Sequence, residues 1–189
     1  MKQTQCCEAC TRLLLDLGIN GTNFTKIFPS RIVIVSSIGH IMVRGGIRFD
    51  DLTMENDYTA YKAYTHSKLA NVLHCKELAK RLEGTGISVY SLHPGTIYTE
   101  LLTDLLVEKK FPLWLANVIK KMLIFSIKTS FHGAQTTIYC CVEDKIEGES
   151  GYYYEGCART TPSRDAQNEE SAKKLWEISG KLVGLKEDA

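Results

Sequence analysis

Residues 61–68 read Tyr61-Lys62-Ala63-Tyr64-Thr65-His66-Ser67-Lys68, and they open the helix around which the rest of the chain is arranged. Residues four apart on a helix lie one turn above each other, so Tyr64 and Lys68 present a phenol and an ammonium on one face. A phenol with its ordinary pKa of about 10 is a poor base at neutral pH, but a neighbouring cation favours the phenolate and lowers that pKa. The pair can therefore exchange a proton with an alcohol or carbonyl oxygen.

Length and composition indicate one intracellular domain with a real core. The chain has 189 residues, of which 44% are hydrophobic and 24% charged. A formal net charge of +1, with no basic stripe interleaved with aromatic residues, argues against a nucleic-acid partner. The seven cysteines are an odd number, and no signal peptide precedes them, so we expect reduced thiols.

Two local patterns suggest a metal site and a membrane segment, but each lacks a feature that such a site or segment requires. Cys7-Glu8-Ala9-Cys10 has metal-ligand spacing, yet no second Cys or His pair completes a tetrahedral set, so we predict no metal. The apolar run from Phe111 to Ile127 is interrupted by Lys120 and Lys121 and is too short and too charged to span a bilayer. We expect it to form a buried or lid helix.

The middle of the chain predicts a strand, helix, strand unit. A β-branched run from Arg31 to Ser37 and a second run from Ile87 to Leu92 suit strands buried on both faces of a parallel sheet. The helix of Tyr64 lies between them, runs to about Arg81, and should cross over with a right hand. Ligands of open α/β sheets sit at the carboxyl ends of the strands, so chemistry is expected at Ser36-Ser37, unless these serines only end the strand.

The remaining segments complete an α/β domain. Residues 39–56 read as a long loop, and loops of that length are often functional. Residues 101–123 are apolar at helical spacing, which is typical either of ordinary core or of a cover over a lipophilic ligand. Further on, the pattern predicts a helix over 130–142, a strand over 152–154 and an amphipathic helix from Ala172 to Val183 packed on the sheet.

Three features now agree in order and spacing: Ser36-Ser37 after a strand, Tyr64-x-x-x-Lys68 on the crossover helix, and Pro94-Gly95-x-x-x-Thr99 after the next strand. Together they resemble the short-chain dehydrogenase/reductase family. The resemblance runs from about residue 29 to 185 and is nearest to the retinol dehydrogenase branch of that family. The segments that carry it are Ser30-Arg31-Ile32-Val33, residues 64–73, residues 77–82 and Leu92-His93-Pro94-Gly95-Thr96.

The resemblance implies a role for each matching residue. Ser37 would hold the substrate oxygen by a hydrogen bond, and Tyr64 would be the acid/base that exchanges the proton on that oxygen. Lys68 would lower the pKa of Tyr64 and bind the ribose of an NADP or NAD cofactor, which carries the hydride. The cofactor would also contact Tyr64 itself and four residues after the second strand, namely Pro94, Gly95, Ile97 and Thr99.

The pattern of the family is not complete. No glycine-rich turn for a dinucleotide pyrophosphate occurs upstream of Ser37, and the Asn-Ala-Gly strand end of the family is also absent. We therefore predict a Rossmann-like, doubly wound parallel sheet that is truncated at its N-terminal side. Residues 1–189 would form one partial domain, with a divergent segment over 1–29 and the catalytic half over 30–185. Its first strand would lie at an open edge, where it could pair with another chain.

Three functions are consistent with these residues. The first is an NAD(P)-dependent oxidoreductase that interconverts an alcohol and a carbonyl on a small lipophilic substrate such as retinol. The second is a catalytically incompetent isoform or fragment, an interaction protein that self-associates or pairs with full-length relatives. The third, a sugar-nucleotide epimerase or dehydratase, fits the Pro94-Gly95-Thr96 segment less well. The resemblance implies a cytoplasmic or membrane-associated protein, because relatives often carry an N-terminal anchor.

Overall fold

The computed structural model describes residues 30–96 and 129–184. Their elements follow one another as β1 (Ser30–Val35), the 3-10 helix η1 (Ile38–Met42), α2 (Ala60–Arg81), β2 (Ile87–His93), α5 (Ser130–Val142), η2 (Asp144–Ile146), β3 (Tyr152–Glu155), β4 (Ala158–Thr160), η3 (Asp165–Gln167) and α6 (Glu169–Leu182). The predicted helix over 130–142 is confirmed at both ends, and the predicted strands agree with β1, β2 and β3 to within a residue or two.

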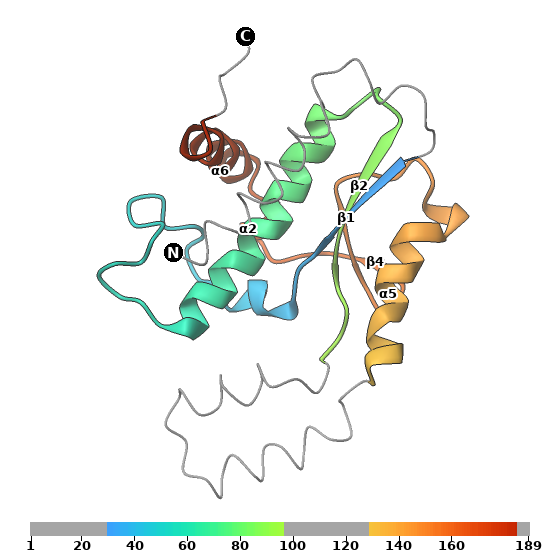
Figure 1. The fold of residues 1–189 in the computed structure, drawn as a ribbon, viewed down its shortest axis with the longest axis horizontal. Helices are drawn as coiled ribbons and strands as arrows, with labels where there is room; N and C mark the ends of the chain where they lie inside the picture. Colours follow the sequence, from blue (N-terminus) through green and yellow to red (C-terminus); the bar gives the residue numbers. More distant parts are fainter. Residues whose placement is uncertain (1–29, 97–128, 185–189) are drawn as a thin grey trace, which may run out of the picture.

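A mostly parallel sheet forms the centre of the molecule, which confirms the predicted α/β fold (Figure 1). The strands lie in the order β1-β2-β3-β4. The first three are parallel, with Val35 opposite Leu92 and Tyr90 opposite Tyr152. The fourth pairs antiparallel to β3. The sequence pattern did not indicate β4, whose three residues are all exposed.

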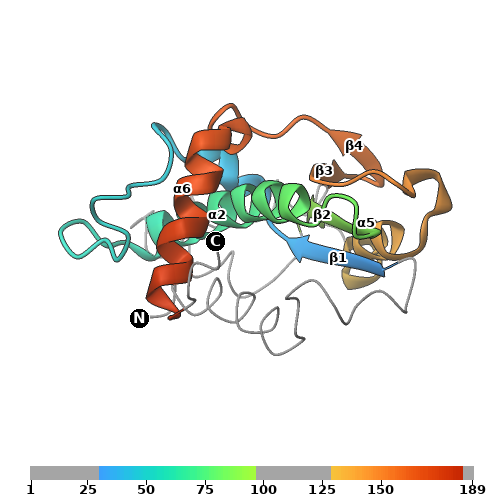
Figure 2. The ribbon, with the colours of Figure 1, turned by 90° about the horizontal axis from the view of Figure 1, so that it is seen from above.

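Helices cover both faces of the sheet. Figures 1 and 2 show α2 and α6 on one side of the strands and α5 on the other. Tyr90 and Leu92 of β2 pack with Cys140 of α5, whereas Val89 packs with Leu78 of α2 on the opposite face. Side chains of alternate residues along a strand point to opposite faces, so the two cores follow from the alternation along β2.

The two parallel crossovers differ in hand. The connections from β1 to β2 and from β2 to β3 move in the same direction across the sheet, but they run through α2 on one face and α5 on the other. Successive crossovers of the same hand would place both helices on one face. One connection is therefore left-handed, which is rare among such units.

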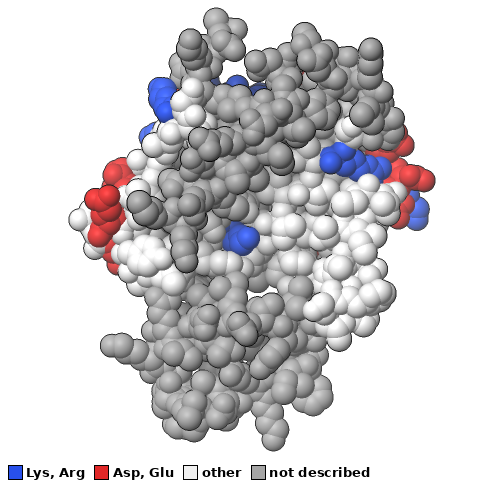
Figure 3. All heavy atoms as spheres, in the orientation of Figure 1, with Lys and Arg blue, Asp and Glu red and all other residues white. Residues whose placement is uncertain are grey.

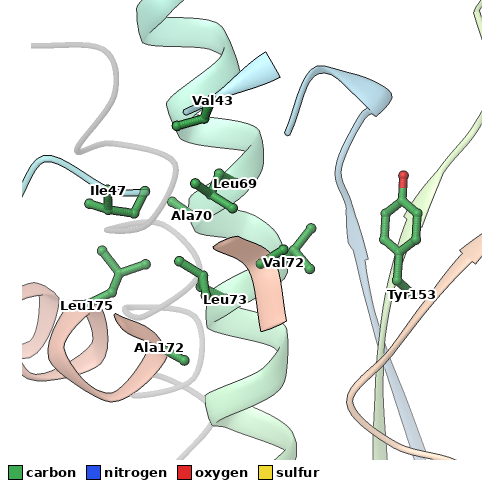
Figure 4. Close-up of a cluster of buried hydrophobic side chains, with 10 residues drawn as sticks. Val43, Ile47, Leu69, Ala70, Val72, Leu73, Tyr153, Ala172 and Leu175 are labelled. Carbon is green, nitrogen blue, oxygen red and sulfur yellow. The ribbon is translucent and has the colours of Figure 1, made fainter. Parts of the chain in front are cut away.

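The last helix lies in a different place from the one expected. We predicted that α6 packs on the sheet, but it packs mainly on α2 and forms an outer layer (Figure 2). Figure 4 shows Leu73 of α2 beside Leu175 of α6, in a cluster that also includes Ile47. The apolar face of α6 is thus buried against another helix, which satisfies its amphipathic pattern equally well.

Local signals explain where α2 begins and ends. The Thr59 hydroxyl accepts a hydrogen bond from the Lys62 N–H over 3.1 Å, which caps the first turn. The helix ends at Arg81, and Gly84 follows with a φ of +77°, a value that favours glycine. This start places Tyr64 and Lys68 in the first turns of α2, beside the end of β1.

Several sequence predictions fall outside the described residues. They are the divergent segment over 1–29 with Cys7 and Cys10, the apolar stretches within 101–127, and the two cofactor contacts Ile97 and Thr99. Among the helices that the structure describes, none combines the length and the apolar character needed to cross a membrane.

Candidate functional site

The carboxyl ends of β1 and β2 lie side by side and bring two predicted segments together. The Ser36 N–H donates to the Leu92 carbonyl oxygen over 2.7 Å, which extends the pairing of the two strands by one residue. Ser36-Ser37 and Pro94-Gly95 therefore follow the carboxyl ends of two neighbouring strands, at the same end of the sheet. Gly95 is half-buried and has a φ of +96°, a conformation that other residues rarely adopt, so the chain turns away from the sheet there.

The two serines have different surroundings. Ser36 Oγ donates to the Lys68 carbonyl oxygen over 2.7 Å and so joins the strand end to α2. Ser37 is buried, and its Oγ accepts a hydrogen bond from the Gly39 N–H over 3.2 Å at the start of η1. Because that bond uses only an acceptor site of Ser37, the hydroxyl can still donate its proton to another oxygen.

The Tyr64 ring lies against the backbone of Gly39. A Cβ atom at position 39 would be 3.0 Å from Tyr64 Cε1 and 3.6 Å from Ser37 Oγ. A separation of 3.0 Å is too short for ordinary carbon contact. Glycine at this position therefore allows the Tyr64 ring to approach the segment that carries Ser37. Sequence reasoning did not single out Gly39, although a glycine two residues after Ser37 is a turn signal.

Lys68 and Tyr64 converge as the i, i+4 spacing predicts. Lys68 Nζ lies 5.7 Å from the centroid of the Tyr64 ring and donates to the Val35 carbonyl oxygen over 3.3 Å. Asn71 Nδ2 donates to the same oxygen over 3.1 Å. Asn71 was missed from the sequence, although it lies one turn beyond Lys68 on the same face of the helix. Figure 3 shows that the charged side chains visible on this face lie mainly toward its two sides, with uncharged side chains between them.

His40 is a second residue that sequence reasoning missed. It is buried, its Nδ1 lies 2.7 Å from the Ser37 carbonyl oxygen, and its Nε2 accepts from the Ser163 N–H over 3.2 Å. These partners fix the neutral tautomer with the proton on Nδ1, because a carbonyl can only accept and an N–H can only donate. Burial lowers the pKa of His40, and the hydrogen bond to Ser37 opposes part of that shift. His40 thus holds the backbone of Ser37 in place.

The structure brings together most of the predicted site residues. Ser37, Tyr64 and Lys68 surround one region beside the end of β1, and Pro94 and Gly95 leave the sheet at the neighbouring strand end. In the described ranges, no group of three or more His, Cys, Asp or Glu side chains is placed to hold a metal ion. The arrangement offers a hydroxyl donor, a phenol and an ammonium, which is the set needed for proton exchange at an oxygen atom.

Comparison with known proteins points to one group of enzymes. No family model matches the chain. The chain is 42% identical over 160 residues to mouse retinol dehydrogenase 11, which covers 85% of this chain and 48% of that protein. It is 41% identical over 158 residues to human retinol dehydrogenase 12, covering 84% of this chain and 47% of that protein. The chain therefore spans about half the length of the curated relatives that it matches.

A wider relative and a solved structure agree with this assignment. A bovine protein named dehydrogenase/reductase SDR family member 13 is 37% identical over 161 residues, which are 83% of this chain and 40% of that protein. An uncharacterized protein from Mycobacterium paratuberculosis of known crystal structure matches the fold with a TM-score of 0.58 and 28% identity, over 82% of this chain and 50% of that one. Over the part that it shares with them, the chain belongs to the short-chain dehydrogenase/reductase family, in the branch of retinol dehydrogenases 11, 12 and 14.

Proposed function

We propose that this chain carries the catalytic residues of an NAD(P)-dependent oxidoreductase that interconverts an alcohol and a carbonyl. The observation that supports this most is the position of Tyr64, whose ring centroid is 5.7 Å from the Lys68 ammonium and whose ring also lies against Gly39 in the turn after Ser37. A phenol next to both a cation and a hydroxyl donor is suited to exchange a proton with a substrate oxygen held at the same place.

Ser37 would orient the substrate. Its hydroxyl proton can point toward a carbonyl or alcohol oxygen, since the bond from Gly39 leaves the donor function of the hydroxyl unused. Its carbonyl oxygen also accepts from the His40 backbone N–H over 3.1 Å and lies 2.7 Å from His40 Nδ1, and both contacts hold the turn that carries the hydroxyl. A fixed donor costs little reorganisation when charge develops on the substrate oxygen.

Tyr64 would transfer the proton, and Lys68 would assist it. When a carbonyl is reduced, the Tyr64 hydroxyl gives its proton to the oxygen of the new alcohol; in the oxidative direction, the phenolate takes that proton back. The positive charge of Lys68, 5.7 Å from the ring, stabilises negative charge on the phenol oxygen. Its bond to Val35 limits the freedom of the long side chain and keeps the ammonium on the Tyr64 side of α2.

The described residues fit the nicotinamide end of a dinucleotide. An ammonium has three N–H donors, and the bond to Val35 uses one, so Lys68 can also bind the hydroxyls of a ribose. The backbone of Gly95, which has no side chain, can approach a planar ring closely at the end of β2. A nicotinamide cofactor, when bound, supplies or accepts the hydride. The resemblance implies NADP or NAD for this role.

A lipophilic substrate is favoured by the relatives and by the surroundings of Ser37. The relatives named above are called retinol dehydrogenases, so retinol, retinal or a similar alcohol or carbonyl is the first candidate. The 3-10 helix that begins after Ser37 exposes two apolar side chains, Ile41 and Met42. Apolar side chains next to a few directed polar groups are typical of sites for small apolar ligands.

A second function, an interaction protein without catalysis, has its own support. The chain corresponds to about half of each curated relative, and the sequence contains no glycine-rich turn before Ser37. Such a protein would act by binding a partner and not by turnover of a substrate. It would bind no nucleotide.

The two functions are separated by cofactor binding and turnover of the whole chain. Titration calorimetry with NADPH, NADP, NADH and NAD should give a saturable signal with one pair, and a panel of retinal and simple aldehydes should show cofactor-dependent reduction. The variant Lys68→Met should weaken cofactor binding by about tenfold or more, whereas Lys76→Met, also on α2, should not. Absence of any nucleotide binding in the folded wild-type chain would contradict the oxidoreductase proposal and favour the interaction protein.

A further inference from the structure

The His40 ring joins the turn after β1 to a segment from late in the chain. The residue is buried, with 1% of its surface exposed. Its Nδ1 lies 2.7 Å from the Ser37 carbonyl oxygen, and its Nε2 accepts from the N–H of Ser163, which lies 123 residues further along the chain. Both ring nitrogens are thus used by protein backbone, so neither is left to bind a substrate.

The segment that supplies Ser163 is itself fixed to α2. We call residues 162–168 the Ser163 segment; it connects β4 to α6 and includes η3. Within it, Ala166 is buried in the cluster between α2 and α6. Lys76 of α2 donates to the Gln167 carbonyl oxygen over 3.0 Å. The Ser163 N–H therefore has a set position relative to α2, the helix that carries Tyr64 and Lys68.

The orientation of the His40 ring is fixed as well. Its centroid lies 4.9 Å from that of the Tyr153 ring of β3, with 58° between the two planes. Tyr153 is also buried, so the two rings pack inside the protein. A ring that is packed on one face and bound at both nitrogens has little freedom to rotate. A shift of the Ser163 N–H would therefore shift Nδ1 and, with it, the carbonyl of Ser37.

We propose that His40 is a positioning residue of the reaction, through which the Ser163 segment sets the place of the Ser37 hydroxyl. This inference rests on the proposed function, in which that hydroxyl donates to the substrate oxygen. His40 would act only through Ser37. The Ser163 segment then contributes to the site, although it lies far beyond every site residue that the sequence predicted.

The Ser37 hydroxyl lies between two anchors. On the β1 side, the N–H and Oγ of Ser36 donate to the carbonyl oxygens of Leu92 and Lys68. On the other side, the bond at Nδ1 of His40 connects the turn to the Ser163 segment. Loss of either anchor would let the hydroxyl move, and a misplacement of about 1 Å in a catalytic group can lower a rate about 100-fold.

Steady-state kinetics of NADPH-dependent retinal reduction test the proposal in variants of His40. His40→Leu removes both side-chain bonds and should lower kcat about tenfold or more, with less than about a threefold change in the KM of retinal, because the hydroxyl matters most when charge develops on the substrate oxygen. His40→Asn places an amide N–H near the position of Nδ1 and should recover part of the lost kcat. His40→Gln, whose longer side chain places its amide near the position of Nε2, should recover less. Circular dichroism and urea denaturation verify that the variants fold.

Variants of Ser163 test the distant end of the same connection. Ser163→Ala keeps the backbone N–H and removes only the hydroxyl, so it should keep the wild-type kcat. Ser163→Pro removes that N–H and should lower kcat several-fold or more, by about the same mechanism as His40→Leu. Adding Ser163→Pro to His40→Leu should lower kcat no further, because the ring that reads the N–H is then absent.

A double-mutant cycle with Ser37 separates positioning from a general loss of structure. In the Ser37→Ala background, His40→Leu should change kcat by less than about twofold, because the hydroxyl that His40 places is already missing. A full additive loss in that double variant would overturn the proposal. So would a wild-type kcat in His40→Leu, or an equal loss of kcat in His40→Asn and His40→Gln. Failure of the proposed function itself looks different, because the folded wild-type chain would then bind no nucleotide.

Discussion

Lys68 donates a hydrogen bond to the carbonyl oxygen of Val35 over 3.3 Å and thereby joins α2 to the last residue of β1. The bond places the ammonium between the strand end and the Tyr64 ring, 5.7 Å from the ring centroid. Val35 is thus part of the support of the site although its own side chain is 43% exposed. The same carbonyl accepts from Asn71, so the position of Lys68 depends on a shared acceptor.

Asn71→Ala should reduce stability and loosen the support of Lys68. Asn71 is buried, and its Nδ2 donates to Val35 over 3.1 Å. Loss of one such bond is expected to lower the free energy of unfolding by about 1 kcal/mol, as measured by urea denaturation. Ser67→Ala is the control, because Ser67 Oγ bonds only within its own helix turn, to Tyr64 O. If both substitutions lowered the free energy of unfolding equally, the bond from Asn71 to Val35 would contribute no more to stability than a bond within the helix.

Gly39→Ala should impair catalysis more than folding. The new Cβ would lie 3.0 Å from Tyr64 Cε1, so the ring must move away from Ser37. A displacement of this kind in a catalytic group is expected to reduce turnover by about tenfold or more, while the midpoint of urea denaturation changes little. The measurement is the rate of carbonyl reduction together with a denaturation curve. An unchanged rate would mean that the contact of Tyr64 with residue 39 does not position the phenol.

Leu73→Ala should be strongly destabilising. Leu73 is fully buried in the cluster between α2 and α6 (Figure 4). Truncation leaves a cavity and is expected to lower the free energy of unfolding by about 2 to 5 kcal/mol. Leu182→Ala, at an exposed site on α6, should change it by less than about 0.5 kcal/mol. A small effect at Leu73 would contradict the packing of the two helices.

Stability should fall in mild acid because of buried histidines. Burial lowers the pKa of His74 from 6.5 to about 4, and it also lowers the pKa of His40 and His66. Between pH 6.5 and about 4, the unfolded chain binds a proton at His74 and the folded chain does not, so protonation favours unfolding. The stabilising contribution of neutral His74 is present above pH 6.5 and is lost as the pH falls through its folded pKa, a total of about 3 kcal/mol.

His74→Phe isolates this effect. The His74 ring stacks on Trp176 with ring centroids 5.2 Å apart, and the Arg81 guanidinium lies 4.7 Å from the centroid of the Trp176 ring. Phenylalanine at position 74 can keep the stacking on Trp176 and removes the titrating group. The plot of unfolding free energy against pH should become flatter between pH 6.5 and about 4, with a residual slope from His40 and His66. If the His74 variant kept the same pH dependence of the unfolding free energy as the wild type, His74 would not be the group responsible.

The sequence was sufficient to predict the elements with strong periodicity. The β-branched runs of β1 and β2, and the helical spacing of α2, α5 and α6, are local patterns that reflect burial. The placement of α6 on α2 was not predictable, because an amphipathic pattern shows that a face is buried but not against which neighbour. The short strand β4 has no hydrophobic pattern, because its three residues are all exposed. It pairs with β3, to which it is joined by the turn at Gly156-Cys157.

Some residues of the candidate site could be predicted from the sequence, and others were found only in the structure. Tyr64 and Lys68 were found because helical geometry fixes how residues four apart lie, and Ser37 because strand ends of parallel sheets meet at one edge. Gly39, His40 and Asn71 act through contacts between distant segments, such as the bond from Ser163 to His40. No spacing rule relates residues so far apart in the chain, so these three became visible only in the structure.

The role of Tyr64 as the acid/base can be measured by the rate of NADPH-dependent retinal reduction in Tyr64→Phe and in the wild-type chain. The substitution removes only the phenol oxygen, and Tyr58→Phe, at an exposed tyrosine just before α2, is the matched control. We predict measurable reduction by the wild-type chain and by Tyr58→Phe, and a loss of about 100-fold or more in Tyr64→Phe. Equal rates for Tyr64→Phe and the wild type, or no cofactor-dependent turnover by the folded wild-type chain, would contradict the proposed catalytic role of Tyr64.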